Sequence, residues 1–127
     1  MSIAESFRNF LVAENLATAD NVTVSRIAAV NLSEDDQWAL VASGGQSEGG
    51  NVSRWKKKYN LTILHRSTSG PRLYAKDDTL QQYNDQCIVL SPYKVIRVTI
   101  SPMTELDMSD ERTHVGNWQA EITTHSL

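Results

Sequence analysis

The residue types that most often do chemistry are thinly spread along this chain. Adjacent carboxylates occur at Asp35-Asp36 and Asp77-Asp78, and histidines at His65, His114 and His125. Adjacent side chains point to opposite faces of a strand and diverge by about 100° on a helix, so neither acidic pair makes a catalytic dyad by itself. No histidine has a second ligand at i+4, the helical spacing of many metal sites. We therefore predict no catalytic residues, no metal ligands and no cofactor.

Other reactive motifs are also missing. The glycines at 44, 45, 49 and 50 do not follow the spacing of a phosphate-binding loop, and no Lys-Ser or Lys-Thr follows them. The single cysteine, Cys87, rules out an intrachain disulfide and a cysteine-based zinc cage, and we interpret it as a small apolar residue near a helix end. A serine hydrolase is not excluded by residue order, but no nucleophile elbow is visible.

Charge is concentrated in two segments. Arg54, Trp55 and the lysines 56–58 form a basic run with an aromatic residue, a mixture that single-stranded nucleic-acid sites also use. A solvated strand with its aromatic side chains on the core explains the run as well. The second segment, residues 101–117, is an acidic loop. Three interpretations of it are open: a solvated loop, the lining of a pore, and a partner of the basic run.

The hydrophobic pattern predicts the elements that must position these residues. Ser2 and Glu5 have the spacing of a capping box at the start of an amphipathic helix, and Ser69 is placed to cap a second helix. The strongest signal is the alternation from Trp55 to Arg66, which is typical of a long antiparallel strand with one face buried from Tyr59 onward. The expected helices are 3–16 and 71–86, and the expected strands are 22–29, 37–43, 55–66, 93–100 and 118–125.

Two long polar loops separate these elements, at 42–52 and 101–117. The first is expected to be the tip of a hairpin made by the second and third strands. In the strand 93–100, Ile96, Val98 and Ile100 are expected on one face. We predict an α+β fold in one domain, 1–127, with two helices packed on one face of a mostly antiparallel sheet.

Composition narrows the function classes. The net charge is −3, so there is no global attraction to nucleic acid, and 40% hydrophobic residues are ordinary for a globular chain. The N-terminus lacks the pattern of a secretory signal, and the apolar runs are too short to span a membrane. We expect a protein made in a reducing cytoplasm and no membrane partner.

The order of elements resembles that of the tail terminator proteins of long-tailed bacteriophages, whose fold is shared with head–tail joining and tail completion proteins. The resemblance covers nearly the whole chain. It is carried by the capped N-terminal helix, the strand 55–65, the second helix behind Gly70-Pro71, and the closing segment 116–124.

The resemblance implies a virion structural protein, not an enzyme. Such proteins form a ring, a homohexamer, at the head-proximal end of the tail tube. The ring ends tube polymerisation, meets the major tail tube protein and the head connector or stopper protein, and lets genomic DNA pass through its lumen without sequence-specific binding. The implied location is the virion tail, after assembly in the host cytoplasm.

Physical roles are then assigned by residue type, since a closed ring needs contacts between two different surfaces. We place a subunit or tube interface at Gln46, Glu48, Asn51, Arg54, Trp55, Lys56 and Lys58. We place a lumen lining or an inter-subunit acidic contact at Glu105, Asp107, Asp110 and Glu111. The alternatives are a head–tail connector or tail completion protein, and a small nucleic-acid-binding protein that uses the basic strand 54–58.

Overall fold

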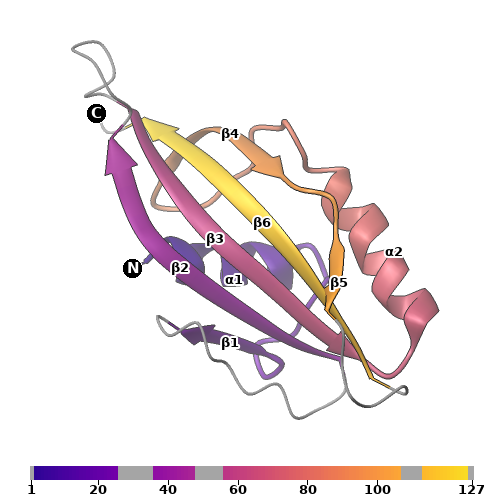
Figure 1. Ribbon diagram of the computed structural model, residues 1–127. Helices are drawn as coiled ribbons and strands as arrows, with labels where there is room; N and C mark the ends of the chain where they lie inside the picture. Colours follow the sequence, from indigo (N-terminus) through magenta and orange to yellow (C-terminus); the bar gives the residue numbers. More distant parts are fainter. Residues whose placement is uncertain (1, 26–35, 48–55, 107–112, 126–127) are drawn as a thin grey trace.

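Two helices and six strands make up the computed structural model, which describes residues 2–25, 36–47, 56–106 and 113–125 (Figure 1). The elements in chain order are α1 Ile3–Ala13, β1 Val22–Ser25, β2 Gln37–Ser47, β3 Lys56–Ser67, α2 Gly70–Gln81, β4 Lys94–Ile100, β5 Thr104–Leu106 and β6 His114–His125. The predicted α+β class is confirmed. One strand, β5, was not predicted.

The strands form one sheet with the order β1-β2-β3-β6-β4, and β5 pairs with the first part of β6. Every pairing is antiparallel except that of β1 with β2, which is parallel. The prediction of a mostly antiparallel sheet and of a β2–β3 hairpin is therefore confirmed. The strand predicted at 22–29 is present as β1 over Val22–Ser25, and residues 26–29 lie outside the described residues. Its parallel pairing with β2 was not predicted.

One face of the sheet carries the core. Along β3, Leu61 and Ile63 are fully buried while Thr62 and Leu64 between them are partly exposed, as the alternation predicts. Leu61 and Ile63 lie opposite Ala120 and Trp118 of β6. These residues belong to a single cluster with apolar side chains of both helices, so α1 and α2 cover the same face. In the described ranges no helix lies on the opposite face, which we call the helix-free face.

Both helices begin at the predicted caps but end early. Ser2 Oγ accepts from the backbone N–H of Glu5 at 3.2 Å, and Ser69 Oγ accepts from that of Arg72 at 3.3 Å. Helix α1 ends at Ala13 instead of 16, before Asn15 at φ 60°. Helix α2 ends at Gln81 instead of 86, because residues 82–85 turn back toward β4.

The two polar loops are shorter than predicted. Strand β2 continues to Ser47, and Gly45 lies opposite Tyr59 after a shift of register that follows Ala42. In the acidic segment, β5 lies opposite residues 115–117 of β6. Composition misled the prediction at both places, since glycines and acidic residues are rare in strands but are tolerated where a neighbouring strand supplies the pairing.

Two further predictions were wrong. Ile96 does not share a face with Val98, because the β4–β6 register shifts between Val95 and Arg97; Ile96 is 40% exposed. Cys87 is exposed and lies beyond the end of α2, with its thiol donating to the carbonyl of Val95 at 3.0 Å. In the described parts of the chain, no helix has the length and apolar character needed to cross a membrane.

Candidate assembly surfaces

Within the described residues, the outer edge of β2 has no neighbouring strand over half its length. Strand β1 pairs with β2 from Trp38 to Val41, and no strand in the described ranges pairs with the outer side of 42–47 (Figure 1). The N–H of Trp38 donates toward β1, to the carbonyl of Asn21 at 2.8 Å. Backbone groups alternate in direction along a strand, so the N–H of Ala42 points to the same outer side. An open row of this kind is a template for pairing with another chain.

The other edge of the sheet is closed by the turn that follows α2. Asp85 N–H donates to the Val98 carbonyl at 2.6 Å, and Val98 N–H donates to the Gln86 carbonyl at 2.8 Å. Next along β4, the N–H of Ile100 donates to the side-chain oxygen of Asn84 at 2.7 Å. These three bonds occupy backbone groups that another strand would need. The sheet therefore has one sealed edge, at β4.

The described ranges contain three of the residues predicted to form an interface, Gln46, Lys56 and Lys58. The backbone of Gln46 lies on the open edge of β2, opposite Lys58 of β3. Lys58 Nζ forms an ion pair with Glu121 at 3.2 Å, and Lys56 is exposed at the start of β3. The remaining members of this prediction, Glu48, Asn51, Arg54 and Trp55, lie outside the described residues. Lys56 and Lys58 share the helix-free face, whereas Lys57 points to the other, so the basic run does not act as one patch.

Of the four acidic residues predicted to line a lumen or to contact another subunit, the structure describes Glu105, on β5. Its Oε1 lies 2.7 Å from Nδ1 of His114, and its Oε2 accepts from the hydroxyl of Tyr74 at 3.1 Å. The contact with His114, followed by that with Tyr74, holds the pKa of Glu105 below its usual value. Glu105 thus links β5, β6 and α2 within the chain. Asp107, Asp110 and Glu111 lie outside the described residues.

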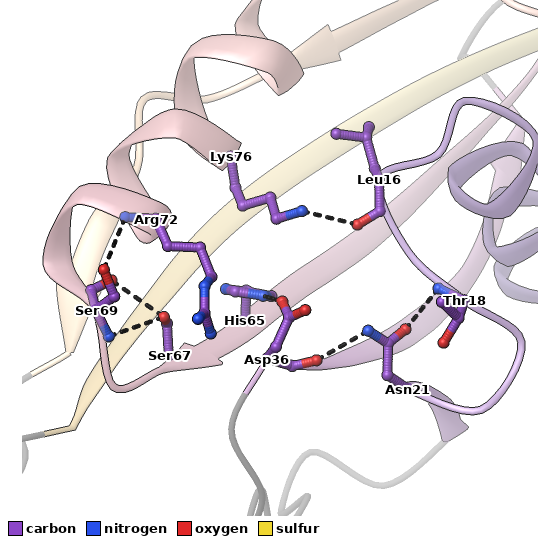
Figure 2. A network of polar contacts seen from close by, with 9 residues as sticks. All are labelled: Leu16, Thr18, Asn21, Asp36, His65, Ser67, Ser69, Arg72 and Lys76. Atoms are coloured by element: carbon purple, nitrogen blue, oxygen red, sulfur yellow. Dashed lines mark hydrogen bonds and ion pairs between the residues drawn. The ribbon is translucent and has the colours of Figure 1, made fainter.

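A buried polar network joins the start of β2 to β3 and to the turn before β1 (Figure 2). His65 is fully buried, and its Nε2 lies 2.7 Å from Oδ1 of Asp36. The Asp36 carbonyl accepts from the side-chain amide of Asn21 at 2.9 Å. His65 also packs against the Trp38 ring, at 4.4 Å between centroids. The network anchors the part of β2 that β1 covers.

Burial keeps His65 neutral. Desolvation lowers its pKa, although the hydrogen bond that His65 donates to Asp36 and the negative charge of Asp36 act in the opposite direction. Nδ1 of His65 has no hydrogen-bond partner among the described residues, so a second ring proton would be buried there without an acceptor. The network was missed in the sequence because His65 and Asp36 are 29 positions apart and no local motif links them.

Within the described residues, the network lacks the serine–histidine hydrogen bond that a serine hydrolase uses. Ser67, the nearest serine along β3, donates to the carbonyl of Ser69 at 3.0 Å, and no serine bond to His65 occurs in the part of the chain that the structure describes. Asp77 accepts from the indole N–H of Trp118 at 2.8 Å, so it serves to tie α2 to β6. Within the described ranges, no three His, Cys, Asp or Glu side chains are placed to hold a metal ion.

Comparisons with known proteins give a likeness in fold. No family model matches the sequence, and no curated protein matches it. The fold, however, is similar to that of a chain in a solved structure described as the virion of a native gene transfer agent (GTA) particle. The superposition has a TM-score of 0.59 and covers 98% of this chain and 92% of that chain, at 8% sequence identity.

The two chains have the same overall fold. Because coverage is almost complete on both sides, the likeness includes the sheet and both helices instead of a shared fragment. At 8% identity it gives no correspondence between individual residues. The surfaces of this chain must therefore be argued from its own edges and charges.

Proposed function

We propose that this protein is a virion structural protein that forms a ring at the head-proximal end of a phage tail tube. The ring ends polymerisation of the tube and joins the tail to the head connector. The observation that carries the proposal is the fold shared, over nearly the full length of both chains, with a chain of a gene transfer agent virion. A non-enzymatic role agrees with the histidine network, whose polar groups are used to hold strands together.

The unequal edges of the sheet support assembly into a ring. A ring of identical subunits needs a contact between two different surfaces of the chain. The open edge of β2, 42–47, supplies one surface, and the sealed β4 edge cannot be its counterpart by strand pairing. An extended segment elsewhere on the neighbouring copy therefore pairs with β2. Main-chain hydrogen bonds give such a contact its affinity.

Light scattering after size-exclusion chromatography tests the ring. A hexamer has six times the 14.2 kDa mass of one chain, and negative-stain microscopy of the same sample shows its central opening. A chain that stays monomeric at 100 µM and shows no rings contradicts the proposal.

The substitution Ala42→Pro tests whether the open edge makes the contact. Proline removes an N–H that points outward, while the bonds between β2 and β3 remain. We expect the association constant to fall at least tenfold, which is about 1.4 kcal/mol. The matched control is Ala42→Val, which keeps the N–H. Unchanged assembly of Ala42→Pro, with a thermal melt like that of the control, assigns the contact elsewhere.

A head–tail connector or tail completion protein is the second candidate, because the same fold likeness fits it. Copolymerisation with tube protein encoded in the same genome separates the two roles. A terminator is found at one end of each tube and shortens tube growth. A connector leaves tube length unchanged.

A further inference from the structure

The strand register aligns basic residues on the helix-free face of the sheet. Lys56 of β3 lies opposite His125 of β6, and His125 lies opposite Lys94 of β4. Lys56 is an odd number of positions from the buried Leu61, so its side chain points away from the core and the helices. We call Lys56, Lys94 and Arg97, a residue of β4 that lies opposite Thr123 of β6, the cationic row. The sequence did not show the row, because its members come from β3 and β4, which are far apart in the chain and are separated by β6 in the sheet.

The lysines of the row are not neutralised by the chain's own acids. Both Lys56 and Lys94 are exposed, and in the described ranges no carboxylate forms an ion pair with either. Arg97 is 3.6 Å from Asp85, with both side chains more than half exposed, so the pair is weak and open to exchange. By contrast, Lys58 on the same face is paired with Glu121. Positive charge therefore collects at this end of the sheet although the whole chain is acidic.

A cavity adjoins the row. It has a volume of about 440 Å³, and its lining includes Lys56, Arg97 and Thr123, whose side chains carry an ammonium, a guanidinium and a hydroxyl. Asp85, Gln86, Cys87 and Ile96 complete the lining. Ammonium, guanidinium and hydroxyl donors are the groups that hold phosphate oxygens. Among the lining residues that the structure describes there is no Trp or Tyr, the side chains that usually anchor a protein partner.

We propose that the cationic row binds the phosphodiester backbone of nucleic acid without reading its sequence. Three neighbouring strands span about 10 Å, whereas duplex DNA carries one charge for every ~1.7 Å of its axis, so the row meets several phosphates at once. The strands hold the row rigidly, and its side chains reach phosphates instead of base edges. In the proposed ring this face is turned toward the DNA. That placement rests on the proposed function, but binding itself is a property of the chain in solution.

Fluorescence anisotropy with two labelled 20-base-pair duplexes of unrelated sequence tests the row. The wild-type chain binds both equally at 25 mM salt. With about three phosphates neutralised, log K falls with log salt at a slope of about −2.7, and affinity drops roughly 200- to 300-fold by 200 mM salt. The double substitution Lys56→Ala with Lys94→Ala lowers affinity at least tenfold and reduces the slope by about 1.8.

The matched control is Lys57→Ala. It removes the same charge from the neighbouring position, but Lys57 lies on the opposite face, with its Nζ 5.5 Å from the centre of the Tyr59 ring. We expect its affinity for DNA to change less than twofold. An equal loss in Lys57→Ala and in the single substitution Lys56→Ala overturns the proposal, since net charge alone would then explain binding.

Two other outcomes contradict nucleic-acid binding by the cationic row, and a third result bears only on the proposed ring. Absence of wild-type binding at 25 mM salt contradicts the row directly. Polyglutamate that binds as tightly as the duplex, and loses affinity in the same double variant, assigns the row to an acidic protein surface. Light scattering on the same samples keeps the ring separate: a monomer that binds DNA through the row supports this inference while contradicting the ring.

Discussion

The two edges of the sheet differ in what their backbone groups do. At β4, the turn after α2 takes up N–H and C=O groups of Val98 and the N–H of Ile100. At β2, no described strand lies beside the outer side of 42–47. Exposed edges promote unwanted association, and proteins normally cover them. Because one edge is occupied and no described strand lies beside the other, we propose that the stretch 42–47 of β2 is used in assembly.

The largest expected effect comes from opening the sealed edge. Asn84→Ala removes the side-chain oxygen that accepts from the Ile100 N–H. Ile100 is only 2% exposed. Loss of a partner for a buried backbone group costs about 1–3 kcal/mol of unfolding free energy. Urea unfolding measures the loss, and light scattering should show new concentration-dependent association through β4.

Two control variants isolate the bond. Gln86→Ala leaves the seal intact because Gln86 bonds through its backbone, so its stability should stay near that of the wild type. Asn84→Asp retains an oxygen acceptor and should recover most of the loss. If Gln86→Ala and Asn84→Ala are equally destabilised, the side-chain acceptor of Asn84 does not seal the edge.

A smaller effect is expected from acid on the half of β2 that β1 covers. The pKa of His65 is lowered in the folded chain, mainly by burial, so the unfolded chain binds the extra proton. Stability is then fully present above the ordinary value of 6.5 and falls as the pH drops below it, by at most about 1.4 kcal/mol per pH unit for one proton. Unfolding free energies measured between pH 7.5 and 5 show the slope.

The substitution His65→Gln should remove this part of the pH dependence while lowering stability at every pH. His125→Gln, at the partly exposed end of β6, is the control and should retain the slope. The pH range over which His65 changes the stability is separate from that of Glu105. The pKa of Glu105 is lowered in the folded chain, so its contribution to stability is lost only below its ordinary value of 4.5. A slope that survives in His65→Gln would contradict the assignment.

The smallest effect is expected from the ion pair between Lys58 and Glu121, which lies away from both edges. Its side chains are 34% and 44% exposed, and exposed pairs contribute about 0.2–1 kcal/mol. A double-mutant cycle with Lys58→Gln and Glu121→Gln measures the coupling and removes the effect of other contacts of Lys58. The variants should assemble like the wild type. A change in ring mass would show that this part of the helix-free face belongs to the interface.

The sequence predicted the elements whose pattern is local. The alternation in β3 gave both the strand and its buried face, and Ser2 and Ser69 marked where the helices begin. Features that depend on partners distant in the chain were missed. Gly45 is in a strand because Tyr59 lies opposite it, and Ile96 is exposed because the register shifts beside it.

The candidate surfaces show the same limit. Lys56 and Lys58 were predicted as one basic segment. Whether each lysine is available to a binding partner depends on the face that its side chain occupies and on whether a carboxylate pairs with it, as Glu121 does with Lys58. The pairing of Lys56 with His125, and of His125 with Lys94, needs the order β3-β6-β4, which composition and periodicity do not determine. The predicted contact of Glu105 with another subunit stays a prediction, since within its own chain Glu105 holds His114 and Tyr74.

The sealed β4 edge also limits how far assembly can proceed. A sheet that is open on both sides is able to add copies indefinitely and grow into a fibre, whereas a sheet with a single free side has a hydrogen-bonding valency of one. Within the described residues, β4 therefore does not pass the pairing on, and the strand that each copy contributes comes from elsewhere in the chain. Growth of one continuous sheet through β4 is thus prevented within the subunit itself, before any symmetry of the particle is imposed.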